Sequence, residues 1–278
     1  MKRIITVQDI SCVGKCSLTV ALPIISAAGV ETCVLPTTLL STHTAFSKFT
    51  FRDLTDEIPK ISDTLAELRI DFDAIYTGYL GSIRQLSAVS EFIDTHKKEK
   101  TAVVIDPAMA DNGRLYCGFN EDFAKEMAKF VGKADLIIPN LTEASFMLGI
   151  PYKENYDEAY IKDVLKRLTA LGCRRAALTG VSFSEKSIGV YEYNSEDGSY
   201  FSYFNERLPA SFHGTGDVYA SATLGAHMRG LSVEDSLSLA VDFTLECMRC
   251  TLCDHDARFY GVNFEEALPM YVNRLYAP

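Results

Sequence analysis

The chain has 278 residues, of which 47% are hydrophobic and 23% charged, and its formal net charge at pH 7 is −10. This composition is typical of a folded globular protein and excludes a largely disordered chain. Acidic residues outnumber basic ones by 37 to 27 without any dense basic run, so no nucleic-acid-binding or anionic-membrane-binding surface is expected.

Neither an export signal nor a membrane anchor is expected. The first seven residues lack the long apolar core of a signal peptide, and no stretch approaches the ~20 apolar residues of a membrane span. A cytoplasmic location without membrane contact follows as the expectation. The eight cysteines are then expected to be reduced thiols, with no structural disulfide.

The first half of the chain alternates between strand-like and helix-like segments. A β-branched run at 4–7 is followed by helical apolar spacing at 18–28, which closes at Gly29. Further strands are predicted at 32–35, 74–77, 102–105 and 136–138, and further helices at 83–96 and 121–131. Such alternation predicts a parallel sheet with helices on both faces.

The second half adds a hairpin and then becomes helical. Its predicted elements are a helix at 157–171, strands at 175–179, 187–193 and 200–204, and helices at 217–228, 233–250 and 264–275. The strands 187–193 and 200–204 are expected to form an antiparallel hairpin or small flap. Because no repeat or low-complexity linker interrupts the chain, we expect residues 1–278 to form one domain with a doubly wound, mostly parallel α/β sheet.

Two long irregular stretches, 36–51 and 106–120, each follow a predicted strand. In open parallel sheets, ligands bind at the carboxyl ends of the strands. We therefore expect functional residues in these two stretches.

The sharpest motif is Gly214-Thr215-Gly216-Asp217, where a loop leads into the helix predicted at 217–228. Main-chain N–H groups at a helix start form a cradle for negative charge, and the two glycines allow close approach. A carboxylate beside that cradle can accept the proton of an attacking hydroxyl during phosphoryl transfer. The alternative is an ordinary glycine-rich helix start capped by Asp217.

Two acidic segments follow predicted strands. Asn140-Leu141-Thr142-Glu143 comes after the strand at 136–138, and Asp106-Pro107-Ala108-Met109-Ala110-Asp111 comes after the strand at 102–105. Asn140 with Glu143 also forms the pattern of a helix N-cap and capping box, and an Asp-Pro pair is also a common turn. For Asn140 and Glu143 the structural and the functional interpretation can hold together.

These three segments resemble motifs of the ribokinase superfamily. The segment from His213 to Asp217 is similar to its anion-hole and base motif, 140–143 to its N-x-x-E motif, and 106–111 to its D-P-V-M-G-D segment. The resemblance implies a ribokinase-like fold with ATP as the phosphoryl donor, Asp217 as the base and Gly214, Thr215 and Gly216 as the anion hole. His213 is left without a role.

The same resemblance implies a nucleotide and metal region. ATP phosphates are expected near Asp106, Asp111, Asn140, Glu143 and Thr179. Mg²⁺ is expected near Asp106 and Glu143, with Glu143 acting mainly through metal-bound water, and a K⁺ ion is plausible by the same resemblance.

Two further segments resemble the pyridoxal kinase branch. Ser41-Thr42-His43-Thr44-Ala45-Phe46 is similar to its S-N-H-T segment, and Thr77-Gly78-Tyr79-Leu80-Gly81-Ser82 to its T-G-Y-L-G-S segment. The resemblance covers the chain from Gln8 to about Cys250. It implies phosphorylation of the 5′-hydroxymethyl group of pyridoxal, pyridoxine or pyridoxamine by a homodimeric enzyme. The residues implied for the vitamer pocket are Gly14, Cys16, His43, Thr44 and Tyr79.

The chain departs from that branch at two positions. Asp9 stands where the family has Ser after the first-strand Gln, and Leu40 replaces an aromatic residue expected near the ring. The vitamer preference is therefore open. Our hypothesis is that the Asp9 carboxylate favours a protonated ring nitrogen or the amine of pyridoxamine by a charge-assisted hydrogen bond.

Three other functions compete with this interpretation. A hydroxymethylpyrimidine or phosphomethylpyrimidine kinase shares His213-Gly214-Thr215-Gly216, but that branch usually has Cys at the next position. A sugar or nucleoside kinase is a weaker choice. A nucleotide-binding relative without turnover would also suit the departures at Asp9 and Leu40, although the intact Asp217 argues against it.

Two segments match parts of the motifs of other kinds of binding site. Val13-Gly14-Lys15-Cys16-Ser17 resembles part of a P-loop, but the position that must be the first glycine is Asp9. Cys247, Cys250 and Cys253 resemble part of an iron–sulfur ligand run, yet no fourth cysteine follows and a helix would spread the thiols around its surface. We expect core packing at those cysteines.

Overall fold

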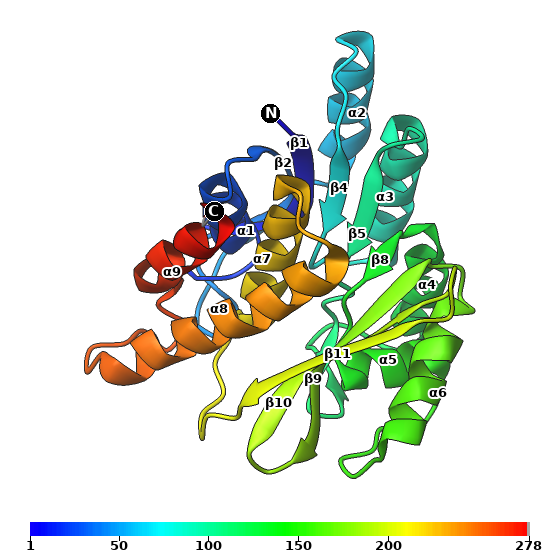
Figure 1. The fold of residues 1–278 in the computed structure, drawn as a ribbon. Coiled ribbons are helices and arrows are strands. Elements are labelled where there is room, and N and C mark those ends of the chain that lie inside the picture. Colours follow the sequence, from blue (N-terminus) through cyan, green and yellow to red (C-terminus); the bar gives the residue numbers. More distant parts are fainter. Residues whose placement is uncertain (277–278) are drawn as a thin grey trace. The chain divides into compact units, whose positions relative to one another are not determined.

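The computed structural model describes residues 1–276, which form two compact units (Figure 1). Unit 1 contains residues 1–73 together with the segment from Leu208 onward, and unit 2 contains Ala74–Arg207. Each unit has its own strands, helices and buried core. The single domain expected for residues 1–278 stays a prediction.

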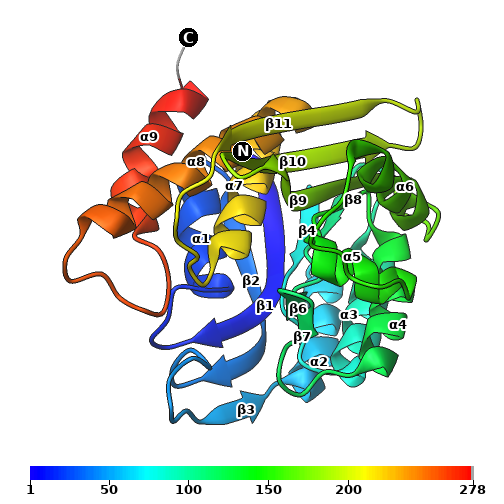
Figure 2. The same ribbon diagram turned by 90° about the horizontal axis from the view of Figure 1, so that it is seen from below.

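Unit 1 is built on three neighbouring strands. β1 (Arg3–Ser11) and β2 (Glu31–Leu40) pair in parallel, and β3 (Phe51–Asp53) pairs antiparallel with the end of β2. The helices of this unit are α1 (Leu18–Ala27), α2 (Ile58–Glu67), α7 (Thr215–Arg229), α8 (Val233–Cys253) and α9 (Phe264–Tyr276), with a 3-10 turn at Thr55–Glu57. α7 packs against both α1 and α8, and α9 packs against α8 (Figure 2).

Unit 2 contains a mostly parallel sheet. β4 (Ala74–Thr77), β5 (Ala102–Ile105), β8 (Leu136–Ile137) and β9 (Arg175–Ser184) are parallel neighbours in the order β9-β8-β5-β4. β10 (Ser187–Asn194) and β11 (Tyr200–Glu206) continue antiparallel beyond β9, and β6 (Ala110–Asp111) and β7 (Arg114–Leu115) form a separate small ribbon. The helices are α3 (Ile83–His96), α4 (Glu121–Phe130), α5 (Leu141–Leu148) and α6 (Glu158–Thr169), with a 3-10 turn at Val131–Lys133.

Each of the four α-helices of unit 2 starts at a polar N-cap. The caps are Ser82, Asn120, Asn140 and Asp157, and each side chain accepts a hydrogen bond from an N–H group in the first turn. Such a cap satisfies one of the N–H groups that a helix start leaves unpaired. The local sequence therefore decides where these helices begin.

The predicted doubly wound, mostly parallel α/β class is confirmed, and the predicted hairpin is β10 with β11. The prediction that 36–51 is irregular throughout is wrong, because β2 continues to Leu40 and β3 begins at Phe51, the last residue of the stretch. Thr37 and Thr38 interrupt the apolar run, yet both are fully buried. Pairing along β1 therefore overrides the local pattern, as is common for strands.

Helices α2 and α5 lie in segments for which the apolar periodicity predicted no element. The short ribbon of β6 and β7 likewise lies within the stretch 106–120 that was expected to be irregular. α5 has only eight residues, so its apolar pattern is too short to distinguish from a strand. Its capping box was the signal that marked it.

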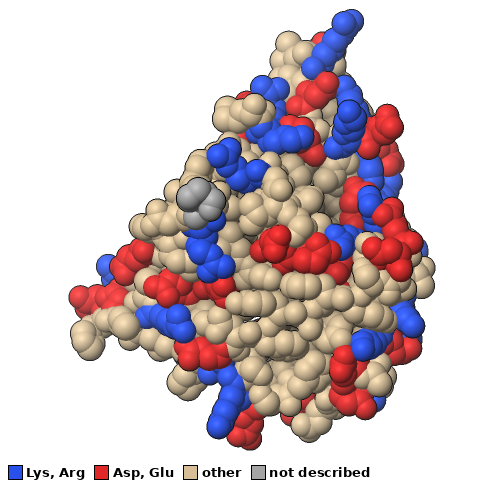
Figure 3. All heavy atoms as spheres, in the orientation of Figure 1, with Lys and Arg blue, Asp and Glu red and all other residues tan. Residues whose placement is uncertain are grey.

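The surface charges and the cysteines were both considered from the composition, and the structure shows where they lie. On the face drawn in Figure 3, acidic and basic side chains are interspersed. No helix among residues 1–276 is long and apolar enough to cross a membrane. Each of the eight cysteines is a free thiol. On α8 Cys247 is buried as expected, but Cys253 is exposed near the end of the helix, so the expectation of core packing is wrong for that residue.

Candidate active site

The glycine turn before α7 is the centre of the candidate site in unit 1. Gly214 has a left-handed backbone with φ of 77°, and a Cβ atom there would lie 2.3 Å from the carbonyl oxygen of Lys15. Only glycine fits both constraints. α7 begins at the next residue, Thr215, whose hydroxyl donates to the carbonyl of Phe212 at 3.3 Å. The first N–H groups of α7 therefore lie where the cradle for an anion was expected, and their binding of an anion stays a prediction.

Asp217 lies in the first turn of α7, directly after this cradle. Burial raises the pKa of its carboxyl group to about 7, and the nearby carboxylate of Asp9 raises it further. The main-chain N–H of Ser17 donates to Asp217 and partly opposes that shift. A carboxyl group with a pKa near neutrality is well matched to act as a general base at physiological pH.

Asp9 is buried in the same unit, with 6% of its surface exposed. It lies where the register of β1 with β2 shifts between Gln8 and Ile10, and such a bulge redirects a side chain from its regular direction. Burial raises the pKa of Asp9 to about 6, against the lowering effect of a hydrogen bond with the Ser17 side chain. Asp9 and Asp217 therefore form a pair of carboxyl groups that share Ser17 as a donor.

Ser17 was not among the predicted site residues. It precedes α1 with φ of 49° and ψ of −127°, a conformation that L residues other than glycine rarely adopt. Strained backbone of this kind is often found at functional sites. No sequence signal reveals the strain, because it depends on the long-range contacts of Ser17 with two carboxyl groups.

The predicted vitamer residues of unit 1 lie on two loops in contact with each other. His43 donates its N–H to the carbonyl of Val13 at 2.7 Å, and a Cβ atom on Gly14 would lie 2.9 Å from the His43 Cβ. Burial lowers the pKa of His43, and the ring of His213 lies 5.5 Å from its own. Cys16 is buried beside Ser11, with 3.9 Å between Sγ and Oγ.

Thr44 is exposed on the same loop, next to His43. Burial raises the pKa of the Cys16 thiol, so this sulfur is neutral and poorly nucleophilic. In unit 1 the structure thus brings Gly14, Cys16 and His43 into one cluster of loops at the carboxyl ends of β1 and β2.

The predicted phosphate residues of unit 2 form a second cluster. Asn140 and Glu143 make a reciprocal capping box at the start of α5, and the Asn140 Nδ2 donates to the carbonyl of Ala110 at 2.8 Å. Asn140 also forms an isolated bridge with Thr179, whose N–H donates to the carbonyl of Pro139 at 2.9 Å. The ends of β8 and β9 are thereby joined to the segment that follows β5.

Glu143 links the same two segments through both carboxylate oxygens. Oε1 accepts the N–H of Met109 at 3.1 Å, and Oε2 accepts the N–H of Asn140 at 2.9 Å. Burial raises the pKa of Glu143 to about 7, against these main-chain donors. Glu143 is therefore held in place by main-chain donors, which confirms the capping box, and its role toward a metal ion stays a prediction.

Three other predicted residues lie in the same unit. Asp106 follows β5 with 6% of its surface exposed, and its N–H donates to the carbonyl of Thr77 at 2.9 Å. Asp111 is exposed and accepts the N–H of Asn112 at 2.9 Å. The ring of Tyr79 lies 5.5 Å from that of Phe119.

The donor set of unit 2 suits a magnesium ion that arrives with a nucleotide. Mg²⁺ prefers oxygen ligands and commonly uses only one or two protein carboxylates together with phosphates and water. Among residues 1–276 no group of three or more His, Cys, Asp or Glu side chains converges as a complete metal site. With each Glu143 oxygen already accepting an N–H group, this side chain fits a metal-bound water better than the ion itself.

The turn at Gly214, the start of α7 and the raised pKa of Asp217 suit an enzyme that transfers a phosphoryl group to a hydroxyl group. The comparisons with known proteins agree with this class. The chain belongs to the phosphomethylpyrimidine kinase family, which matches residues 22–258.

Several kinases are similar to this chain over most of its length. A Bacteroides thetaiotaomicron protein classed with the phosphomethylpyrimidine kinases and crystallised with pyridoxal is 40% identical, with a TM-score of 0.92 over 97% of this chain and 95% of its own. The pyridoxal kinase of Lactobacillus plantarum is 28% identical, with a TM-score of 0.90 over 99% and 98%. The Dictyostelium discoideum pyridoxal kinase is 25% identical over 82% of this chain and 78% of its own. The predicted resemblance to ATP-dependent kinases of the pyridoxal kinase branch is confirmed.

Proposed function

We propose that the protein transfers the terminal phosphoryl group of ATP to the 5′-hydroxymethyl group of pyridoxal, pyridoxine or pyridoxamine. The observation that carries the proposal is Asp217, a carboxyl group with a pKa of about 7 in the first turn of α7, beside the Gly214 turn. Similarity to pyridoxal kinases, and to a protein crystallised with pyridoxal, supports the choice of substrate.

In unit 1, the chemistry needs one proton acceptor and one anion cradle. Asp217 accepts the hydroxyl proton late in the transfer, because the transition state of phosphoryl transfer is loose. The N–H groups of Thr215 and Gly216 stabilise the negative charge of the migrating group. Gly14, Cys16, His43 and Thr44 contact the vitamer ring.

In unit 2, the proposed task is to hold the nucleotide. Asn140, Thr179 and Asp111 contact ATP phosphates, and Asp106 and Glu143 hold Mg²⁺, Glu143 through a bound water. Tyr79 is the one vitamer-binding residue proposed in this unit. The Mg²⁺ ion would neutralise the charge of the phosphates, and a K⁺ ion near this cluster is a further expectation. A homodimer and a cytoplasmic location also stay predictions.

The competing substrate class is a hydroxymethylpyrimidine or its phosphate, for which the matching family is named. Asp217 favours the B6 vitamers, because that sister branch usually has Cys at this position.

The test is a coupled ADP-release assay with pyridoxal, pyridoxine, pyridoxamine and hydroxymethylpyrimidine as separate acceptors. We expect ADP release that depends on a B6 vitamer and is abolished in Asp217→Asn. ADP release with hydroxymethylpyrimidine alone would assign the competing substrate class. ADP release with none of the four would favour a nucleotide-binding relative without turnover.

A further inference from the structure

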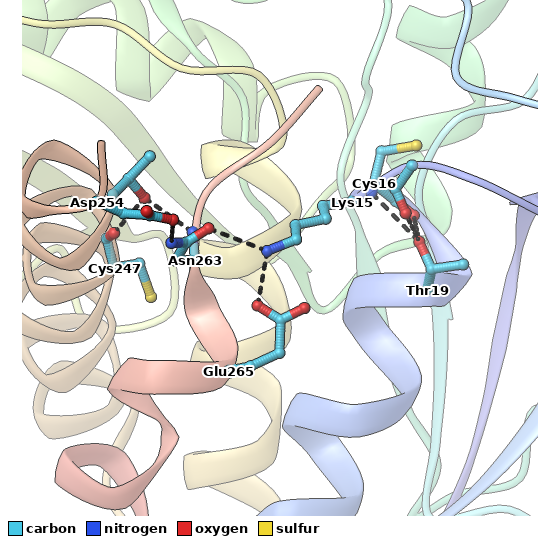
Figure 4. Close-up of polar contacts among 9 residues, drawn as sticks. Lys15, Cys16, Thr19, Cys247, Asp254, Asn263 and Glu265 are labelled. Atoms are coloured by element: carbon cyan, nitrogen blue, oxygen red, sulfur yellow. Dashed lines mark hydrogen bonds and ion pairs between the residues drawn. The ribbon is translucent and has the colours of Figure 1, made fainter. Parts of the chain in front are cut away.

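Lys15 lies in the loop between β1 and α1, inside the segment that fails as a P-loop. Its ammonium group extends toward the start of α9, where it donates to Asn263 Oδ1 at 3.2 Å and Glu265 Oε2 at 2.8 Å (Figure 4). The Lys15 side chain is only 18% exposed. This lysine is therefore held by protein groups from the C-terminal part of unit 1.

The main chain of Lys15 is held by the same region. Its N–H donates to the carbonyl of Tyr260 at 3.3 Å, and a Cβ atom on Gly261 would lie 2.4 Å from the Lys15 Cβ. Gly261 thus lets residues 260–265 lie directly against Lys15. We refer to residues 254–265 as the C-terminal brace.

The brace is itself fixed to the end of α8. The Asn263 Oδ1 accepts the hydrogen bond from the Lys15 ammonium group. The main-chain N–H of Asn263 donates to Thr251 Oγ1 at 2.8 Å, and its Nδ2 donates to Asp254 Oδ2 at 2.8 Å. Figure 4 shows Lys15, Asn263 and Asp254 following one another in this chain of hydrogen bonds. A movement of the Lys15 side chain would therefore disturb this series of hydrogen bonds.

On its other side, Lys15 touches the anion-hole turn. Its carbonyl oxygen lies 2.3 Å from the position of a Cβ atom on Gly214, so the two backbones are in direct contact. The residues just before Lys15 contact the proposed vitamer loop, since Val13 accepts the N–H of His43 at 2.7 Å. That loop also meets the brace, with ring centroids of Phe46 and Phe259 4.8 Å apart.

We propose that Lys15 is a positioning residue that fixes the Gly214 turn and the His43 loop by tying both to the C-terminal brace. The expected change in kcat rests on the proposed function, whereas the contacts of Lys15 do not depend on it. A displacement of about 1 Å can cost on the order of 100-fold in rate, so small movements of this turn matter. A partly exposed ion pair contributes little to stability by itself, so the expected loss is one of position rather than of folding.

The first test is Lys15→Met with Arg274→Met as a matched control. Arg274 also tethers α9, through Asp242 at 3.2 Å, but lies outside the proposed contacts. We expect Lys15→Met to lower kcat by about 10- to 100-fold and to raise the vitamer KM. We expect Arg274→Met to retain the kcat of the unchanged protein, with a similar small shift in Tm for both variants. Lys15→Arg, which keeps the charge, should restore most of kcat.

The second test changes the other side of the contact. Gly261→Ala would push against Lys15, whereas Gly230→Ala also places a side chain at a positive φ but with no atom within 4 Å of the new Cβ. We expect only Gly261→Ala to lower kcat. If either Lys15→Met or Gly261→Ala fails to fold, Glu265→Gln weakens the same hydrogen bond more gently.

Equal kcat in Lys15→Met and Arg274→Met would overturn the proposal. If the unchanged protein phosphorylates none of the acceptors, the proposed function fails, and hydrogen–deuterium exchange of residues 212–218 still tests the brace without a substrate. Faster exchange there in Lys15→Met than in Arg274→Met supports the proposal, and identical exchange rejects it.

Discussion

The carboxyl groups of unit 1 and unit 2 are buried in different ways. Asp217 accepts the main-chain N–H of Ser17 and lies near a second carboxyl group, Asp9. Glu143 accepts main-chain N–H groups on each of its two oxygens. A carboxyl group beside a second carboxyl group is suited to exchange a proton, whereas one whose two oxygens both accept N–H groups is suited to hold the backbone in place.

The largest expected effect is on the turnover of an Asp217 variant. Asp217→Asn removes the proton acceptor, so kcat should fall by about 10²- to 10⁴-fold. Single-turnover ADP release measures the loss. Asp235→Asn is the control, since Asp235 also lies in the first turn of a helix but outside the site. An Asp217→Asn variant with normal turnover would contradict the assignment.

At Glu143 we expect an effect on stability as well as on turnover. Glu143→Ala leaves the N–H groups of Met109 and Asn140 without acceptors, so the free energy of unfolding should fall by about 2–4 kcal/mol. Loss of the phosphate cluster should also lower kcat by roughly 10- to 100-fold. Urea denaturation and steady-state kinetics measure the two effects. Glu143→Gln, which retains one acceptor oxygen, should lie between, and equal stability of all three proteins would contradict the role of Glu143.

The pH dependence sharpens the assignment of Asp217. Because its pKa is raised to about 7, kcat/KM should fall about tenfold per pH unit well below pH 7, as the base becomes protonated. Asp9→Asn removes a negative charge that raises this pKa, so the midpoint should move to lower pH. A pH–rate profile of both proteins checks the direction. An acid limb with the same midpoint in both would show that Asp9 does not influence the base.

The same shift predicts how stability depends on pH. The folded-state pKa of Asp217 is higher than its ordinary value of 3.8, so its contribution to stability is complete below about pH 4 and is lost as pH rises through 7. Asp217→Asn, which stays neutral, should therefore be more stable than the unchanged protein at pH 8, by on the order of 1 kcal/mol given its partial exposure. Thermal unfolding at pH 5 and pH 8 measures the difference, and a destabilised variant at pH 8 would contradict it.

The smallest expected effect concerns the choice of vitamer. If the Asp9 carboxylate binds a protonated ring nitrogen or an amine, Asp9→Ser should lower the ratio of kcat/KM for pyridoxamine over pyridoxal by about tenfold or less. Parallel assays of the two vitamers give the ratio. An unchanged ratio would remove Asp9 from the specificity of the enzyme.

Local signals in the sequence determined the class of the fold and the two main motifs. The alternation of strands and helices, the N-caps such as Asn140, and the glycines of the Gly214 turn all act within a few residues of one another. The turn at Gly214, the carboxyl group in the first turn of α7 and the capping box could therefore be predicted from the printed sequence.

Only the tertiary structure decided how those motifs are supported. Asp9 and Asp217 are 208 positions apart, and the hydrogen bonds of Lys15 span 248 and 250 positions. Contacts across such separations depend on how β1, α7 and α9 pack, which no local pattern encodes. The strained Ser17 and the brace at Lys15 arise in this way, so the same five residues that failed as a P-loop contribute two supports of the candidate site.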